Sequence, residues 1–219
     1  MVKKRETVAN LERLLQEKFG SGQSFRPSSR KFEAGVRALD DIGLEQGAVN
    51  EVVSEAASSG TGCLINGLLA ASQEHQVALI DGRDCFDPES SEATDSSLLW
   101  VRCQRADEAM KAADILLRDG NLPLVLLDLQ LNPAVETRRI AASSWYRLKA
   151  LAHETDTTLL AFTSEKSIPC AAVRLLLRQQ FSLSAFDHRR ENVNLLPVLE
   201  RTRQPALAAV DTPAFARTG

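Results

Sequence analysis

The chain has 219 residues, of which 44% are hydrophobic, and a formal net charge of −3. This length fits one α/β domain with appendages, and the slightly negative charge argues against a protein that coats nucleic acid by bulk electrostatics. No apolar run approaches the roughly 18 residues that a membrane-spanning helix needs, and the opening MVKKRE is followed by no hydrophobic signal segment. We therefore expect a cytoplasmic protein without membrane contact.

The four cysteines are scattered along the chain without a C-x-x-C pair, and the three histidines are equally dispersed. This spacing favours reduced, mostly buried thiols over disulfides or a metal site. The cysteines are Cys63, Cys85, Cys103 and Cys170.

Residues 1–30 are predicted to form an amphipathic helix and a linker. Within residues 7–19 apolar side chains recur every three or four positions, and a Gly/Ser/Pro-rich stretch follows. The helix could dock on its own domain or on a partner, and both alternatives stay open. The candidate contact residues on it are Leu11, Leu15 and Phe19. The Pro/Ala-rich tail, residues 204–219, is predicted to be disordered.

Residues 49–69 have the outline of a phosphate-binding loop: a buried strand, a turn of small residues and an apolar helix. A working loop of this kind reads Gly, four residues, then Gly-Lys-Ser/Thr. Here Glu55 stands at the opening glycine, Thr61 at the lysine and Gly62 at the hydroxyl residue that would hold magnesium. The degenerate loop comprises Ser58, Ser59, Gly60, Thr61, Gly62 and Cys63.

Loss of the lysine and the metal ligand removes most of what such a site offers, because phosphoryl transfer depends on positioning and charge neutralisation. We therefore expect neither catalysis nor a cofactor. One alternative stays open, in which backbone groups of this loop accept a weak anion at the helix N-terminus.

The rest of the chain alternates apolar strands with helices. Strands are expected at residues 77–81, 98–103, 122–128 and 157–163, and helices at 64–72, 106–118 and 137–153. This alternation predicts βαβ units and a parallel sheet. Beyond Pro169 the apolar period changes to two, through Val173 to Leu177 and on to Phe181, Leu183, Val193 and Leu195, which predicts antiparallel hairpin strands at the sheet edge.

Five stretches in this order resemble a known family: EVVSEAASSGTGCL, ALIDGRDCFDP, LLWVRC, LPLVLLDL and SSWYRLKALA. Together they are similar to the RecA-like fold, a P-loop NTPase core, and within it to the ImuA group of short RecA paralogues encoded beside error-prone DNA polymerases. The resemblance covers residues 32–203 and implies a RecA-like domain over residues 31–203, with a mainly parallel sheet flanked by helices.

The resemblance also implies roles for single residues. The water-activating glutamate of RecA falls on Arg83, where the charge is reversed. Asp128 matches the strand-end carboxylate that supports magnesium in the family, and its alternative interpretation is a turn residue after a strand.

The family's DNA-binding loops would correspond to residues 132–139 and 164–174, which carry few cations. An aromatic and basic cluster, Trp145, Tyr146 and Arg147, could stack on a base or anchor a partner. The candidate partner or DNA contacts outside the N-terminal helix are Arg138, Arg139, Trp145, Lys166 and Arg174.

The leading hypothesis is a catalytically inactive RecA-like accessory protein of DNA repair and SOS mutagenesis. As the resemblance implies, it would contact RecA, an ImuB-like polymerase partner or both during translesion synthesis. Two alternatives stay open: a divergent ATPase activated in trans by a partner or single-stranded DNA, and a regulator of RecA filaments. Weak DNA contact and homo-oligomerisation also remain open.

Overall fold

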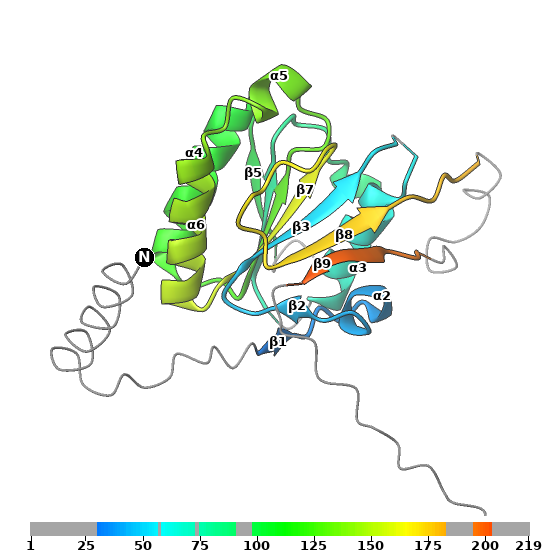
Figure 1. The fold of residues 1–219 in the computed structure, drawn as a ribbon, viewed down its shortest axis with the longest axis horizontal. Helices are drawn as coiled ribbons and strands as arrows, with labels where there is room; N and C mark the ends of the chain where they lie inside the picture. Colours follow the sequence, from blue (N-terminus) through cyan, green and yellow to red (C-terminus); the bar gives the residue numbers. More distant parts are fainter. Residues whose placement is uncertain (1–29, 57, 73–74, 91–97, 183–194, 203–219) are drawn as a thin grey trace, which may run out of the picture.

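The computed structural model describes residues 30–56, 58–72, 75–90, 98–182 and 195–202 (Figure 1). The predicted N-terminal helix with Leu11, Leu15 and Phe19, most of its linker and the predicted C-terminal tail lie outside the described residues. What was inferred for these segments stays a prediction.

A seven-stranded sheet forms the centre of the molecule, in the order β5-β4-β6-β7-β3-β8-β9. Each neighbouring pair is parallel except β8 and β9, which are antiparallel. The strands are β3 (Val49–Ser54), β4 (Val77–Asp81), β5 (Leu98–Arg102), β6 (Leu124–Asp128), β7 (Thr158–Thr163), β8 (Val173–Leu177) and β9 (Val198–Thr202).

Helices cover both faces of the sheet (Figure 1). Helices α4 (Ala106–Asp119) and α6 (Ala142–Thr155) pack side by side on one face, where their apolar residues join one core cluster. Helix α3 (Thr61–Ala71) lies on the other face in a second cluster. Every residue of β3, β4 and β7 is buried, as expected for strands covered on both faces. The predicted α/β class with a mainly parallel sheet is confirmed.

Short elements complete the fold. Strands β1 (Lys31–Phe32) and β2 (Leu44–Glu45) form a separate antiparallel pair, and helix α2 (Arg37–Asp40) lies between them in the chain. A 3-10 turn, η1 (Pro88–Ser90), follows β4, and helix α5 (Ala134–Thr137) follows β6.

The helix predicted over residues 137–153 differs from the observed structure. Helix α5 ends at Thr137, and α6 begins only at Ala142. Ile140 lies in the turn between them, where its N–H donates to the Thr137 carbonyl at 3.2 Å and its side chain packs against the core. The half-buried apolar Ile140 in an otherwise exposed turn therefore extended the helical pattern by one turn.

The predicted antiparallel strands at the sheet edge beyond Pro169 are confirmed for β8 and β9, which pair with Val173 opposite Thr202. On its other side β8 runs parallel to β3, with Val52 opposite Leu175, which the prediction did not include. Phe181 and Leu195 lie outside the strands, and Leu183 and Val193 lie outside the described residues. The alternation of side chains gives no strand direction, which here is set by the crossover from β7 through residues 164–172.

Candidate functional site

The degenerate loop connects β3 to α3. Gly60 is the residue before the helix and has φ of 92° and ψ of 17°, a left-handed conformation that favours glycine. The turn directs Thr61 into the first position of α3 and leaves the backbone N–H groups of the first helical turn at its N-terminus. The backbone here therefore passes from a buried strand through a left-handed glycine to a helix N-terminus.

The side chains do not complete such a site. Thr61 is buried, and its hydroxyl lies 2.6 Å from the hydroxyl of Ser54 at the end of β3, so the residue in the lysine position faces the interior. Gly62 is exposed, and a Cβ placed there would have no other atom within 4 Å. Cys63 is half-buried. Neither a cation nor a magnesium ligand comes from these positions.

Two apolar side chains from the segment beyond β8 lie over the turn at Gly60. A Cβ on Gly60 would lie 2.6 Å from Cδ2 of Leu195 and 2.8 Å from Cε2 of Phe181, so both side chains press on the turn. The Phe181 N–H also donates to the Ser58 carbonyl at 3.0 Å. Ser59 is fully buried, and its hydroxyl has no hydrogen-bond partner in the described part of the chain. Phe181 and Leu195 were missed as site residues, because no local pattern shows which distant turn they cover.

Arg83, which the resemblance aligns with the water-activating glutamate of RecA, is exposed, and its side chain reaches Gln104. Its guanidinium donates from Nη1 to the Gln104 carbonyl at 2.9 Å, in the connection between β5 and α4. A guanidinium in this place accepts no proton, since arginine stays protonated in proteins.

Asp81 and Asp128 end the adjacent strands β4 and β6 and stand opposite each other in the register. The Asp81 carboxylate accepts the N–H groups of Cys85 at 3.0 Å and Phe86 at 2.7 Å. Asp128 accepts the Gln130 N–H at 3.0 Å. Both carboxylates therefore hold the turns after their strands, as the alternative interpretation of Asp128 proposed.

The folded structure also disfavours the ionised form of the Asp128 carboxyl relative to the protonated form. Burial, opposed by the Gln130 N–H and assisted by the negative charge of Asp81, raises its pKa to about 6. No cation is drawn to this carboxylate by any contact among the described residues.

The cations of the two predicted DNA-contact loops are largely engaged within the chain. Arg138 forms a bidentate pair with Glu165, with both N···O distances at 2.7 Å, and this pair links the two loops. Lys166 is paired with Glu200 of β9. Arg139, in contrast, is exposed, and its guanidinium contacts no carboxylate in the described ranges.

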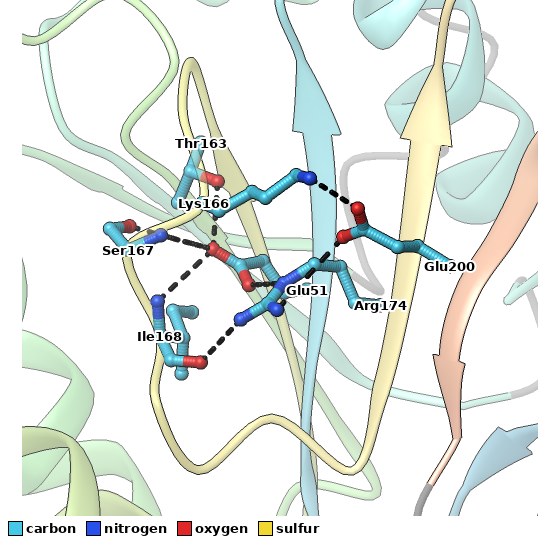
Figure 2. Close-up of polar contacts among 7 residues, drawn as sticks. All are labelled: Glu51, Thr163, Lys166, Ser167, Ile168, Arg174 and Glu200. Atoms are coloured by element: carbon cyan, nitrogen blue, oxygen red, sulfur yellow. Dashed lines mark hydrogen bonds and ion pairs between the residues drawn. The ribbon is translucent and has the colours of Figure 1, made fainter.

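Arg174 belongs to a buried cluster around Glu51, in the middle of β3 (Figure 2). Glu51 is fully buried, and its Oε2 accepts the Arg174 Nε–H at 2.5 Å. Its Oε1 accepts the N–H groups of Ser167 at 2.9 Å and Ile168 at 3.2 Å, and the Thr163 hydroxyl at 3.2 Å. A charged residue inside the apolar strand VNEVVS was a signal that could have revealed this cluster.

The same cluster fixes the loop after β7. Arg174 also donates from Nη2 to the Ile168 carbonyl at 2.7 Å, and its Nη1 lies 4.0 Å from Glu200. The Arg174 side chain is only 12% exposed. These contacts leave Arg174 a structural role and little surface for nucleic acid.

Trp145 was considered as a contact residue, but the structure places it in the core at 1% exposure. Tyr146 is the exposed aromatic residue of that cluster, at 51%. Successive positions on a helix face different directions, so only one of the two can point to solvent.

Among the described residues no group of three His, Cys, Asp or Glu side chains lies close enough to hold a metal ion. Cys103 and Cys170 are buried, whereas Cys85 is exposed, contrary to the general expectation of buried thiols. In the same part of the chain, no helix has the length and apolar character to cross a membrane.

Comparison with known proteins gives no family assignment: no protein-family model matches the chain, and no curated protein is significantly similar to it.

Glu51→Gln should lower the free energy of unfolding by about 3 kcal/mol, because it leaves the buried Arg174 guanidinium without its carboxylate. Chemical denaturation at neutral pH measures the change. Lys166→Gln is the matched control, since its pair is half exposed and should contribute less than about 1 kcal/mol. Equal losses in the two variants would contradict a special role for the buried pair.

Asp128→Asn should stabilise the protein by about 2 kcal/mol at pH 7 and by clearly less at pH 4. The folded pKa, about 6, is above the ordinary value of 3.8, so the folded state binds the proton more tightly and the aspartate protein loses stability as pH rises from about 4 to 6. The amide keeps the Gln130 hydrogen bond without the charge. Thermal unfolding across this pH range tests the effect.

Asp87→Asn serves as the comparison, because Asp87 is an exposed turn residue whose Oδ1 accepts the Glu89 N–H at 3.1 Å. The amide keeps this hydrogen bond, so the substitution should not reproduce the pH-dependent gain in stability of Asp128→Asn. A gain for Asp128→Asn that does not depend on pH would show that the carboxyl charge is not the cause.

Proposed function

We propose that this chain is a catalytically inactive RecA-like accessory protein of the DNA-damage response, acting through protein contacts in an ImuA-like translesion-synthesis complex. One observation supports the proposal: the loop between β3 and α3, where the resemblance places a phosphate site, has no side-chain cation and is contacted by apolar side chains of the same chain. Thr61 is turned to Ser54, and Phe181 and Leu195 press on Gly60.

The missing charge is the central argument. A triphosphate needs cations at its oxygens, because its charge is otherwise unpaired in a site from which water is partly excluded. Thr61 is neutral and buried, and Glu55, at the start of the loop, is an exposed acid. These residues offer a nucleotide only backbone N–H groups.

The layout of the sheet is compatible with the RecA-like resemblance. The sheet is mostly parallel, helices cover both faces, and the loop follows β3, an inner strand. Open parallel sheets bind ligands at the carboxyl ends of such strands. In this chain, that edge carries turn-forming carboxylates and a covered loop.

The predicted DNA-contact loops support protein contacts over DNA binding. Arg138, Lys166 and Arg174 are paired with Glu165, Glu200 and Glu51, and the net charge of the chain is −3. Phosphate contacts supply most of the affinity of a DNA-binding protein and require available cations. A role in a DNA-repair complex would therefore depend on partners that themselves hold the DNA.

A divergent ATPase is the second candidate, because Asp128 keeps a carboxylate at a strand end next to Asp81. A partner would then supply the missing cations in trans, as arginine fingers do. Turnover that appears only with single-stranded DNA or a polymerase partner, and disappears in Asp128→Asn, would favour this candidate.

The purified chain should neither hydrolyse ATP nor gain thermal stability from ATP with magnesium. Ligand binding to the folded state raises the melting temperature, so a shift of several degrees would contradict the proposal. Removing the covering side chain in Phe181→Ala should leave this result unchanged, because the site still has no cation. ATP binding gained by that variant would instead identify a closed but competent site.

The partner is tested by co-purification with RecA and with an ImuB-like polymerase homologue. We expect at least one of them to be retained, and Leu11→Asp with Leu15→Asp to weaken retention if the N-terminal helix supplies the contact. Retention of RecA alone would favour the filament regulator, and retention of the polymerase homologue would favour the mutagenesis complex. Failure to retain either would contradict both.

A further inference from the structure

A groove of about 390 Å³ is lined by residues of the first turns of α4 and α6, of α5, and of the turn between α5 and α6. Helix α5 lies near the end of α4 (Figure 1). Its floor is apolar, formed by Met110 at 8% exposure and the half-buried Ile140. Four cations surround this floor: Arg105, Lys111, Arg139 and Arg147. The groove therefore combines a space for an apolar side chain with a basic rim.

Cations outnumber acids in the groove, and the two acids present are already engaged. Glu136 accepts the Ala106 N–H at 3.0 Å through Oε2. Asp107 lies 2.8 Å from Arg105 and 3.5 Å from Lys111, so it serves two cations. Arg147 is paired as well, its Nε lying 2.9 Å from Asp114, which is outside the groove lining. The lining still has four cations against two acids, and Arg139 is the rim cation with no carboxylate contact among the described residues.

The start of α6 adds to this positive character. Ala141 precedes the helix with φ of −63° and ψ of 140°, no side chain caps the helix, and its first turn contains no acidic residue. Uncapped N–H groups and the helix dipole favour negative charge here. Arg139 precedes the first residue of α6 in the sequence and Arg147 follows it, and both side chains line the groove.

We propose that this groove binds an acidic segment of a partner protein, with one apolar side chain on Met110 and Ile140 and flanking carboxylates on the basic rim. The proposal rests on the function proposed above and names the surface and the chemistry of its protein contact. Charge complementarity selects the occupant. A nucleic acid fits less well, because its sugar-phosphate backbone has no apolar side chain to place on Met110 and Ile140.

The binding test uses the full chain and three fluorescent probes: a peptide with Leu-Phe flanked on both sides by Asp and Glu, the same peptide with Ser-Ser at its centre, and an oligothymidine. Fluorescence anisotropy at low salt should show the Leu-Phe peptide binding with Kd below about 100 μM. The Ser-Ser peptide should bind about ten-fold more weakly, as expected from loss of an apolar anchor. Absence of binding, or tighter binding of oligothymidine, would overturn the proposal.

Two variants locate the binding in the groove. Arg139→Glu and Ala141→Asp should each lower the affinity for the Leu-Phe peptide about ten-fold, because each adds a negative charge that repels the acidic peptide. Ala141→Asp also supplies a good helix cap, so its melting temperature should rise and misfolding would not explain lost binding. Arg37→Glu, on a fully exposed cation in α2, should leave the affinity unchanged. Equal affinity in all variants would overturn the assignment.

Leu11→Asp combined with Leu15→Asp distinguishes binding of a partner from binding of the helix predicted at the chain's own N-terminus. If that helix occupied the groove, the double variant would bind the Leu-Phe peptide more tightly than the unchanged chain, which would overturn the assignment to a partner. Unchanged affinity supports it. Failure of peptide binding leaves the ATP result as an independent test of the proposed function.

Discussion

A buried carboxylate must find compensating donors, and in this protein Glu51 imposes that requirement on the centre of the sheet. Its side chain accepts from Arg174 in β8 and from two N–H groups of the loop after β7. Arg174 in turn approaches Glu200 in β9. One buried carboxyl group in β3 therefore holds the neighbouring strand, the preceding crossover and the edge of the sheet together. It lies three residues before the end of the strand that leads into the loop.

Much of the fold could be predicted from local pattern. The strand Val77–Asp81 and the helix Ala106–Asp119 were predicted closely, because a short apolar run and a helical period with a left-handed glycine cap are local features. The parallel pairing of β8 with β3 could not be predicted, since alternation is the same in parallel and antiparallel strands. The start of α6 was misplaced because Ile140 extends the apolar period into a turn.

The candidate site divides in the same way. The sequence shows directly which residue types the loop lacks. It also allowed Asp128 to be interpreted as a turn residue, which the structure bears out. The sequence does not show which side chains contact the loop, because Phe181 lies over 100 positions beyond Ser58 in the chain. The pairing of Arg174 was also hidden, although Glu51 in an apolar strand should have raised the question of its partner. Side-chain partners are set by tertiary packing, which local sequence does not encode.

The contacts over Gly60 join distant parts of the chain. Phe181 and Leu195 both follow β8 in the sequence, yet their side chains lie against the turn between β3 and α3. Bringing such distant segments together has an entropic cost that contacts between sequence neighbours do not have. The turn at Gly60 therefore acquires its final packing only when the C-terminal part of the domain has folded against it.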